Sequence, residues 1–272
     1  MKKVVLITGA SSGIGKSIAE RLLKDDFILY VAARRTEKMR DLETQGAYVL
    51  ELDITSENNI VEVVGRIEQE HGGVDILINN AGYAVYGAVE DIPMSEARRQ
   101  FEVNLFGLAS LTKKVLPYMR AKREGLIINM SSIAGKIYTP LGAWYHATKF
   151  ALEGWSDCLR VELKPFDVNV VIIEPGAILT EFADVMYEPM LEYSGEGPYQ
   201  EMAHQMARSV KDTYKKGMSS PPSVIAEVVA KAIYTKKPKY RYAAGKFAST
   251  FLWIRKWLGD RLYDKALQKQ LS

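Results

Sequence analysis

A tyrosine and a lysine stand four residues apart, at Tyr145 and Lys149. In a helix this spacing places both side chains on one face. A phenol has a pKa near 10 and exchanges protons poorly at neutral pH, but a neighbouring ammonium favours the phenolate and lowers that pKa. The pair therefore suits general acid–base chemistry on a carbonyl or an alcohol. We expect the adjacent His146 to project elsewhere on the helix and assign it no role.

Tyrosine–lysine pairs with this spacing are more often structural than catalytic, but two further groups of polar residues follow predicted strands. Ser131 and Ser132 end the apolar run 126–130, where α/β folds place their ligand crevice. A serine hydroxyl there can donate a hydrogen bond to a developing oxyanion. The sequence Asn-Asn-Ala-Gly at 79–82 ends another run, and its glycine allows a close backbone approach. Together these groups predict a catalytic centre in that crevice.

A glycine-rich turn spans 8–15, between the apolar run 4–7 and a stretch with helical spacing. Glycine lets the backbone turn tightly and approach a pyrophosphate, and the following helix N-terminus offers N–H groups and partial positive charge to the anion. Taken alone, such a turn fits an ordinary loop equally well. Its position after a buried strand favours a dinucleotide site.

The end of the second predicted strand, 27–33, bears on which dinucleotide is bound. An acidic residue there would bind the ribose 2′-hydroxyl of NAD, whereas a basic one accommodates the 2′-phosphate of NADP. Arg34 and Arg35 occupy this place, and guanidinium groups match phosphate in charge and geometry. The alternative is a pair of solvated surface arginines. We predict NADP(H) as the cofactor.

The elements that must position these residues alternate along the chain. Apolar runs predict strands at 4–7, 27–33, 48–52, 74–78, 126–130, 168–173 and 240–244. Helical spacing predicts helices at 14–24, 60–67, 95–119, 145–163 and 224–233, and Ser220 and Pro221 read as a helix cap and first helical residue. This alternation predicts one Rossmann-type α/β domain over 1–272, a doubly wound parallel sheet of about seven strands with helices on both faces.

Five motifs stand in a specific order. They are a TGxxxGxG turn at 8–15, NNAG at 79–82, Ser132 placed 13 residues before Tyr145, YxxxK at 145–149, and a PGxxxT segment at 175–180. In these motifs the chain resembles the short-chain dehydrogenase/reductase family, continuously from residue 3 to about 180. The epimerase and dehydratase relatives carry a TGxxGxxG turn instead, which favours simple alcohol–carbonyl redox here.

The resemblance implies roles for single residues. Tyr145 would be the acid–base residue, Ser132 would hold the substrate oxygen, and Lys149 would bind the nicotinamide ribose and lower the pKa of the tyrosine. Asn104 matches the asparagine that anchors a water in the proton relay, and Asp53 matches the aspartate that contacts adenine. The implied cofactor site comprises Gly9, Ser11, Ser12, Gly13, Ile14, Gly15, Arg34, Arg35, Asp53, Ile54, Asn80, Ala81, Gly82, Tyr145, Lys149, Pro175, Gly176, Ile178 and Thr180.

The segment 181–222 lies where this family places a mobile substrate lid, and it is rich in methionine. Such surfaces suit varied apolar ligands, although methionines that pack a lid helix against the body explain the composition equally well. The stretches 83–90 and 144–146 look most like the hydroxysteroid and retinol dehydrogenase branch. That likeness implies a bulky lipophilic (steroid-, retinoid- or long-chain-like) ketone, aldehyde or alcohol. A β-ketoacyl thioester reductase is the alternative.

A C-terminal extension, about 246–272, carries apolar residues at helical spacing together with Trp253 and Trp257. An amphipathic helix with tryptophans and basic residues can lie on a membrane surface, but we favour packing against the core or a second chain. The predicted helices 95–119 and 145–163 resemble the family's dimerisation surface. We therefore expect a homodimer or a homotetramer.

Bulk composition excludes several classes of protein. A formal net charge of +3 with scattered basic residues argues against nucleic-acid binding. Cys158 is the single cysteine, and the three histidines show no zinc-ligand spacing, so we expect neither a disulfide nor a metal. The N-terminal apolar stretch is too short for a signal peptide and no run reaches a membrane-spanning length, so we expect a cytoplasmic protein.

One rival hypothesis comes from a different functional class. A nucleotide-binding sensor could keep the fold and bind NADP(H) without turnover. Such a protein would be expected to have lost Tyr145, Lys149 or Ser132, and all three are present. The residues therefore favour an enzyme that acts on a small-molecule substrate.

Overall fold

The sheet forms from short aliphatic runs, most of which are buried on both faces. The computed structural model describes residues 2–215 and 217–271. Three residues therefore lie outside the described part of the predicted domain 1–272: Met1, Lys216 in the segment 181–222, and Ser272 in the C-terminal extension. The strands are β1 (Lys3–Thr8), β2 (Phe27–Ala33), β3 (Tyr48–Glu51), β4 (Ile76–Asn79), β5 (Gly125–Met130), β6 (Val168–Pro175) and β7 (Arg241–Ala244). They pair in parallel in the order β3-β2-β1-β4-β5-β6-β7, which confirms the predicted seven-stranded doubly wound sheet.

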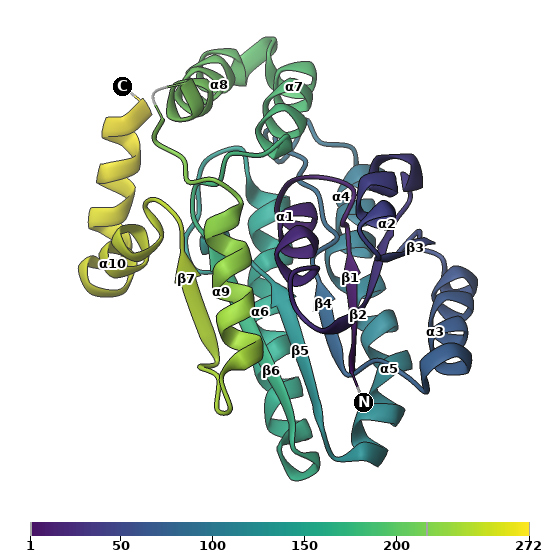
Figure 1. Cartoon of the computed structure of the whole chain (residues 1–272). Helices are drawn as coiled ribbons and strands as arrows, with labels where there is room; N and C mark the ends of the chain where they lie inside the picture. Colours follow the sequence, from purple (N-terminus) through teal and green to yellow (C-terminus); the bar gives the residue numbers. More distant parts are fainter. Residues whose placement is uncertain (1, 216, 272) are drawn as a thin grey trace.

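Helices cover both faces of this sheet and bury its strands (Figure 1). One face carries α1 (Gly13–Leu22), α2 (Arg40–Thr44) and α9 (Ser223–Tyr234), and the other carries α3 (Glu57–His71), α5 (Leu108–Lys122) and α6 (Ala143–Leu163). Ile18 and Val229 belong to the first apolar cluster, while Ile67 and Val115 belong to the second. Strands covered on both faces read as continuous apolar runs, which explains why the sequence marks them clearly.

The helix predicted over 95–119 is interrupted. It divides into α4 (Met94–Phe101), a π-helical turn η2 (Glu102–Gly107) and α5. At Gly107 the Ile54 carbonyl lies where a Cβ would stand, so the helix passes very close to the loop after β3. A π turn inserts a residue without disturbing the apolar spacing on either side, which is why periodicity did not reveal it. The 3₁₀ turn η1 (Thr36–Met39) and the short helix α2 were also not predicted.

The prediction of a helix cap at Ser220 is wrong, because α9 begins at Ser223. Ser220 is engaged elsewhere: its N–H donates to the Ala177 carbonyl at 2.9 Å, and its Oγ accepts from the Lys246 N–H at 3.0 Å. The Leu179 N–H in turn donates to the Ser220 carbonyl at 2.8 Å. These bonds fasten together the two ends of the segment 181–222.

That segment folds into two helices above the carboxyl ends of the strands (Figure 1). They are α7 (Phe182–Ser194) and α8 (Gln200–Lys215), joined through a short 3₁₀ turn, η5 (Gly197–Tyr199). Met190 is fully buried in a cluster that also contains Tyr86 and Tyr145. The buried Ser194 donates to Asp91 Oδ2 at 2.6 Å and accepts from the Ala88 N–H at 2.9 Å. The segment is thus fixed to the body at its middle as well as at its ends.

The C-terminal helix α10 (Ala248–Leu271) is kinked at Gly259, whose φ is 69°. Its packing against the chain leaves Trp253 58 % and Trp257 65 % exposed. Beyond the kink, the buried Tyr263 donates from its hydroxyl to the Tyr138 carbonyl at 3.0 Å, so this half covers the loop after β5. Among the described helices, none combines the length and apolarity needed to cross a membrane.

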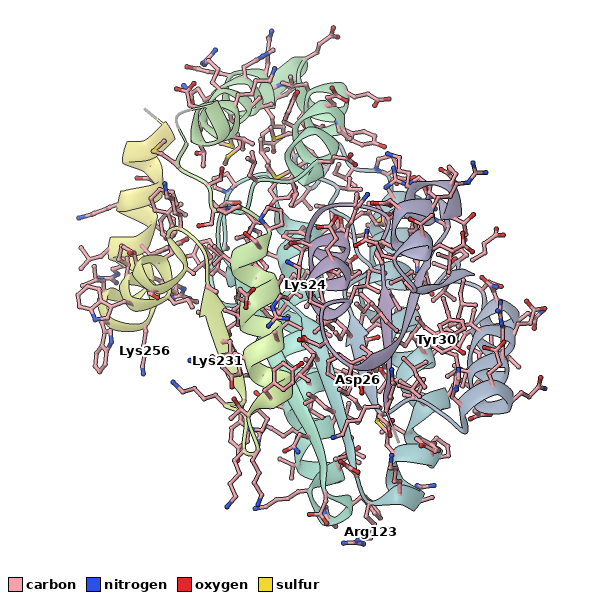
Figure 2. All side chains as sticks on the ribbon, viewed as in Figure 1. Lys24, Asp26, Tyr30, Arg123, Lys231 and Lys256 are labelled. Carbon is pink, nitrogen blue, oxygen red and sulfur yellow. The ribbon has the colours of Figure 1, made fainter. Side chains whose placement is uncertain are left out.

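Charged side chains are spread over the outside of the molecule. Figure 2 labels Lys24, Asp26, Arg123 and Lys231, which come from different elements and are all exposed. Tyr30 by contrast is fully buried, where its ring stacks on Tyr48 at 4.9 Å.

Candidate active site

A cavity of about 990 Å³ opens at the carboxyl ends of β1, β2, β4, β5 and β6. The order of strands reverses between β1 and β4, which is where such sheets bind ligands. Of the predicted site residues, all but Gly15 and Asn104 line this cavity. The structure therefore brings together residues from seven separate stretches of the chain.

The turn after β1 is packed too tightly for side chains. Gly9 has a φ of +68°, and a Cβ there would lie 2.8 Å from the Ala81 Cα. Gly15 packs inside the turn against the Gly9 carbonyl, so it shapes the turn without reaching the cavity. Within the described residues the Ser12 hydroxyl makes no capping hydrogen bond to α1. Ser12 therefore leaves the N–H groups of the first helical turn available to an anion.

The loop after β4 is fastened to this turn. Thr8 Oγ1 accepts from the N–H groups of Asn80 and Ala81, both at 3.0 Å. The Asn80 amide donates to the carbonyls of Thr8 and Gly9 at 3.0 and 3.1 Å. Asn79 points the other way and donates to Asn129 Oδ1 at 2.9 Å inside the sheet. Asn80 thus holds the glycine turn, and Thr8 is a supporting residue that the motifs alone did not single out.

Basic residues gather where the chain leaves β2. Arg34 and Arg35 are exposed and line the cavity, and Arg35 Nη2 lies 3.5 Å from Ser11 Oγ. Asp53 accepts from the Thr55 N–H at 2.9 Å, and this bond lowers the pKa of Asp53, with help from Arg34 and Arg99. Sequence reasoning missed Arg99, which reaches the cavity from α4 and carries no motif signal.

Tyr145 and Lys149 lie on the first two turns of α6, and each is 7 % exposed. The Lys149 ammonium donates to the Met130 carbonyl at 2.9 Å and lies 5.8 Å from the centre of the Tyr145 ring. Burial lowers the pKa of Lys149 to about 8, and the charge of Glu153 opposes this shift. The four-residue spacing therefore produces the juxtaposition that it predicted.

Ser132 stands across the same cavity at the end of β5. Its Oγ accepts from the Ala134 N–H at 3.1 Å and lies 3.5 Å from the Pro175 carbonyl, to which it can donate. Asn104 in contrast is 1 % exposed, and its amide bonds the Tyr83 backbone at 2.9 and 3.0 Å. The Asn104 side chain therefore shapes the cavity wall, whereas Ser132 faces the cavity with Tyr145 and Lys149.

The expectation that His146 projects away from the site is wrong. It is 6 % exposed and lines the cavity, because the loop 136–142 folds back over the first turn of α6. Its Nε2 accepts from the Thr139 N–H at 3.1 Å, so Nδ1 carries the proton and donates to the Ala134 carbonyl at 3.0 Å. Burial lowers the pKa of His146, which keeps the ring neutral in this arrangement.

Apolar side chains line the cavity beside Tyr145. Tyr86, Ile137 and Met186 line it, and the Tyr86 ring centre lies 5.8 Å from that of Tyr145. The methionine-rich composition of 181–222 pointed to this segment, but nothing in the sequence marked Tyr86 or Ile137 individually. In the part of the chain that the structure describes, no group of acidic, histidine or cysteine residues could hold a metal ion.

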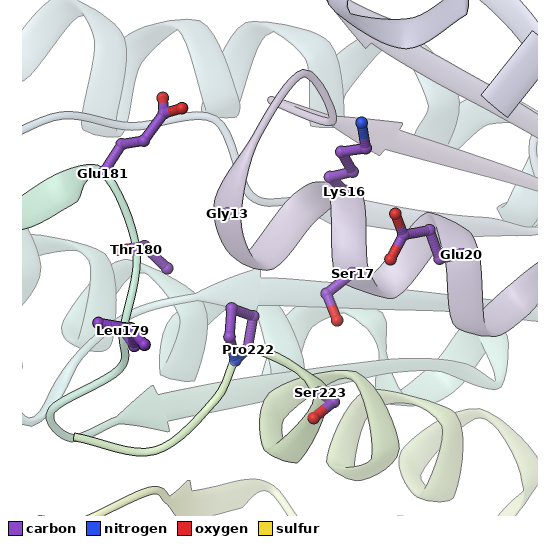
Figure 3. A pocket seen from close by; sticks show the side chains of 9 residues that line it. All are labelled: Gly13, Lys16, Ser17, Glu20, Leu179, Thr180, Glu181, Pro222 and Ser223. Carbon is purple, nitrogen blue, oxygen red and sulfur yellow. The ribbon is translucent and has the colours of Figure 1, made fainter. Parts of the chain in front are cut away.

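A second, smaller cavity of about 400 Å³ adjoins the first. Figure 3 shows it between the first turns of α1 and the ends of the segment 181–222, with Leu179 and Pro222 on one side and Ser17 on the other. Gly13 and Thr180 line both cavities. The smaller cavity thus marks where the segment leaves and rejoins the body.

The family model for short chain dehydrogenase matches residues 3–190, which is more than half of the chain. The chain belongs to the short-chain dehydrogenase family. This agrees with the resemblance read from the motifs at 8–15, 79–82, 145–149 and 175–180.

Among short-chain dehydrogenases, the chain is 34% identical over 268 residues to the 3-ketodihydrosphingosine reductase of Bacteroides thetaiotaomicron, covering 98% of this chain and 97% of that protein. It is 33% identical over 281 residues to the NADPH-dependent 3-dehydrocapnine reductase of Ornithobacterium rhinotracheale, covering 99% and 98%. A crystal structure of a short-chain dehydrogenase from Streptomyces avermitilis aligns with a TM-score of 0.82 and 34% identity over 99% of this chain and 98% of that one. These matches establish an oxidoreductase of this family without distinguishing its branches.

Proposed function

We propose that this protein is an NADP(H)-dependent oxidoreductase that interconverts a carbonyl and an alcohol on a lipophilic substrate. The observation that carries the proposal is the convergence of Tyr145, Lys149 and Ser132 on one cavity whose far end holds Arg34 and Arg35. An acid–base group and an anion site in one cavity are what dinucleotide-dependent alcohol–carbonyl redox requires.

The cavity has the features needed to hold the cofactor. Gly9 and Gly13 leave a cradle that side chains would fill, at the N-terminus of α1, where the pyrophosphate would bind. Arg34 and Arg35 would hold the 2′-phosphate, and Lys149 would hold the nicotinamide ribose. When bound, the cofactor supplies or accepts a hydride equivalent. The relative from Ornithobacterium rhinotracheale is an NADPH-dependent reductase, which supports the choice of NADP(H).

The side chains of the chain itself would manage the proton. In the direction of reduction, the Tyr145 hydroxyl donates its proton to the carbonyl oxygen, and the Lys149 ammonium stabilises the phenolate that remains. Ser132 Oγ holds the substrate oxygen in place by a hydrogen bond. The buried surroundings of Tyr145 exclude water, which strengthens each of these interactions. In the direction of oxidation the same groups act in reverse.

The substrate class follows from the walls of the cavity. Tyr86, Leu141 and Tyr145 share one apolar cluster with side chains of α7 and α8, so we propose the segment 181–222 as a substrate lid. The helix members of this cluster include Met186, Met190, Met202, Ala203, Met206 and Ala207. Two of the relatives are named as reductases of 3-ketodihydrosphingosine and of 3-dehydrocapnine. We therefore propose a ketone with a lipophilic body as the preferred substrate class. No specific contact favours a β-ketoacyl thioester.

The test is reduced-cofactor consumption, NADPH against NADH, over ketones and aldehydes graded in size and polarity, with 3-ketodihydrosphingosine included. Turnover with NADPH on lipophilic ketones is expected, and Tyr145→Phe should lower kcat by about 10²–10⁴-fold. The exposed Tyr240→Phe should retain activity and serves as the matched control. Cofactor binding without turnover on any substrate would instead favour the sensor hypothesis.

A further inference from the structure

Two buried carboxylates, one of them a helical turn beyond Lys149, have no role in the chemistry described so far. Glu153 stands on α6, one turn beyond Lys149, and is 3 % exposed. Glu174 stands on β6 and is 4 % exposed. Burying a carboxylate is costly unless a cation or several hydrogen-bond donors compensate it, so both positions call for an explanation.

Glu153 is held as an anion by cations from two other elements. Its Oε2 accepts from Arg241 Nε of β7 at 2.9 Å and lies 3.1 Å from Lys136 Nζ, just beyond η3 (Ile133–Gly135). At Gly135 a Cβ would lie 2.8 Å from Glu153 Cγ, so the backbone confines the side chain. Within the described residues, Glu153 Oε1 has no hydrogen-bond partner. The carboxylate is therefore fixed in place with part of its charge uncompensated by hydrogen bonds.

Glu174 belongs to the same cluster but behaves differently. Its Oε1 lies 3.5 Å from Arg241 Nε, and Arg241 also donates to Asp157 at 2.6 Å. Burial and the charge of Glu153 raise the pKa of Glu174 to about 7, although Lys136 and Arg241 oppose that shift. A proton on Glu174 therefore relieves part of the repulsion between the two carboxylates near neutral pH.

Tyr145, Lys149 and Glu153 follow one another at four-residue intervals along one face of α6. The ammonium of Lys149 donates to a backbone carbonyl and sits in a buried place, where a charged amine tends to lose its proton. A neutral amine would no longer stabilise the phenolate of Tyr145. The nearby anion is the group that counteracts this tendency.

We propose that Glu153 is a positioning residue for the reaction: its carboxylate, fixed by Lys136 and Arg241, keeps the Lys149 ammonium charged beside Tyr145. The catalytic consequence rests on the proposed function, but the coupling between Glu153 and Lys149 does not. The charged groups that face this pair are Lys136 after η3, Glu174 on β6, Arg241 on β7, and Asp157 on α6, which also pairs with Arg160.

The coupling is tested on the protein without cofactor by NMR. Lysine side chains labelled with ¹³C at Cε are followed through a pH titration, and the midpoint of the Lys149 signal is measured. The Lys149→Met variant assigns that signal. Glu153→Gln should lower the midpoint of Lys149 by about one pH unit or more. Glu174→Gln makes the same change of carboxylate to amide in the same cluster and leaves the Glu153 charge. It should lower the Lys149 midpoint by less than Glu153→Gln does, because the charge of Glu153 is the one that acts on Lys149. A merely structural role would move the midpoint equally in both variants.

An unchanged midpoint in Glu153→Gln, or an equal fall in both variants, overturns the proposal. If Glu153→Gln does not fold, Lys136→Gln decides, because this partly exposed lysine can be neutralised without burying a new group. Its loss should raise the Lys149 midpoint, and no rise would count against the coupling.

In active enzyme, the pH at which kcat/KM falls on the alkaline side should shift in the same direction as the Lys149 midpoint in each variant. A shifted lysine in a protein without turnover would retain the coupling and reject the proposed function.

Discussion

At the scale of residues, the charges at the end of β2 set the expected coenzyme preference. Arg34 and Arg35 are exposed at the rim of the cavity, with Arg35 close to Ser11 of the glycine turn. Their guanidinium groups can bind a phosphate through several N–H donors in a fixed plane. The 2′-hydroxyl of NAD carries no charge and gains far less from them.

Replacing both arginines by serine should therefore affect one coenzyme and not the other. A hydrogen bond to a charged group contributes about 1.5–3 kcal/mol, so kcat/KM for NADPH should fall by about 10-fold or more. The value for NADH should stay within about twofold of its starting level. Steady-state kinetics with both coenzymes measure this, and Lys24→Ser, which removes an exposed charge elsewhere, is the control. A parallel fall with both coenzymes would contradict the assignment.

His146 predicts a dependence of stability on pH. Burial holds its folded pKa below the ordinary value of 6.5, although the hydrogen bond to the Ala134 backbone opposes that shift. Below pH 6.5 the His146 side chain binds a proton in the unfolded chain more readily than in the folded chain, which favours unfolding. The contribution of the neutral His146 ring to stability is therefore complete above pH 6.5 and is lost as the pH falls toward the folded pKa.

Between about pH 7 and about pH 5.5, His146→Gln should lose less unfolding free energy than the unsubstituted protein, by up to about 1.4 kcal/mol per pH unit. Urea denaturation at the two pH values measures the difference. His204→Gln is the matched control, because His204 is exposed on α8 and should leave the pH dependence unchanged. Identical losses in the protein and in His146→Gln would show that the ring titrates freely in the folded state.

At the scale of elements, polar contacts help to attach α7 and α8 to the body of the domain. Ser194 makes two of them, to the Asp91 carboxylate and the Ala88 N–H, and is itself fully buried. Removing its hydroxyl leaves both partners without this bond inside the protein. An unsatisfied buried group costs about 1–3 kcal/mol, so the contact determines how firmly the lid lies on the cavity.

Ser194→Ala should accordingly loosen the lid without unfolding the sheet. Amide hydrogen exchange in α7 and α8 should accelerate by about tenfold or more, while β1 and β5 keep their protection. Ser110→Ala provides the comparison, because Ser110 donates to Glu57 at 2.8 Å on an exposed surface and its loss should change little. Unaltered exchange in the two helices would mean that apolar packing alone holds the lid.

The elements also show what sequence reasoning could reach. The strands were predictable because buried parallel strands read as apolar runs, as at 126–130, and the site was predictable because its residues follow those strands. The π turn over 102–107 was not, since it leaves the apolar spacing intact. The place of His146 depends on a loop that folds back over it, and the pairing of Glu153 with Arg241 joins residues 88 positions apart. Such contacts exist only in the assembled fold.

At the scale of the whole molecule, α6 presents an apolar stripe to solvent. Phe150, Gly154, Cys158 and Val161 recur at helical spacing, and all four are exposed. Phe106 on η2 is also 53 % exposed. Contiguous apolar surface on a soluble protein marks an interaction site more often than a free face. We therefore propose this stripe as an interface of the homodimer or homotetramer that the sequence predicts.

Introducing charge into this stripe should separate the subunits. We expect a double variant, Phe150→Glu with Val161→Glu, to be monomeric by light scattering coupled to size-exclusion chromatography, with the fold retained by circular dichroism. Val61→Glu, on the exposed side of α3, should keep the oligomer and controls for added charge. A monomer before substitution, or an oligomer that survives the double variant, would refute this interface.

The chain enters and leaves the lid at neighbouring points, since Ile178 pairs with Ser220 and Leu179 bonds the same residue. A segment closed at its base in this way can change in length at small cost, about 0.6 kcal/mol for each doubling. Recombination within a gene could thus exchange the stretch between 180 and 219 as a cassette. A lineage would then acquire a new range of substrates in one event, while the residues on α6 that we propose for proton transfer were inherited unchanged.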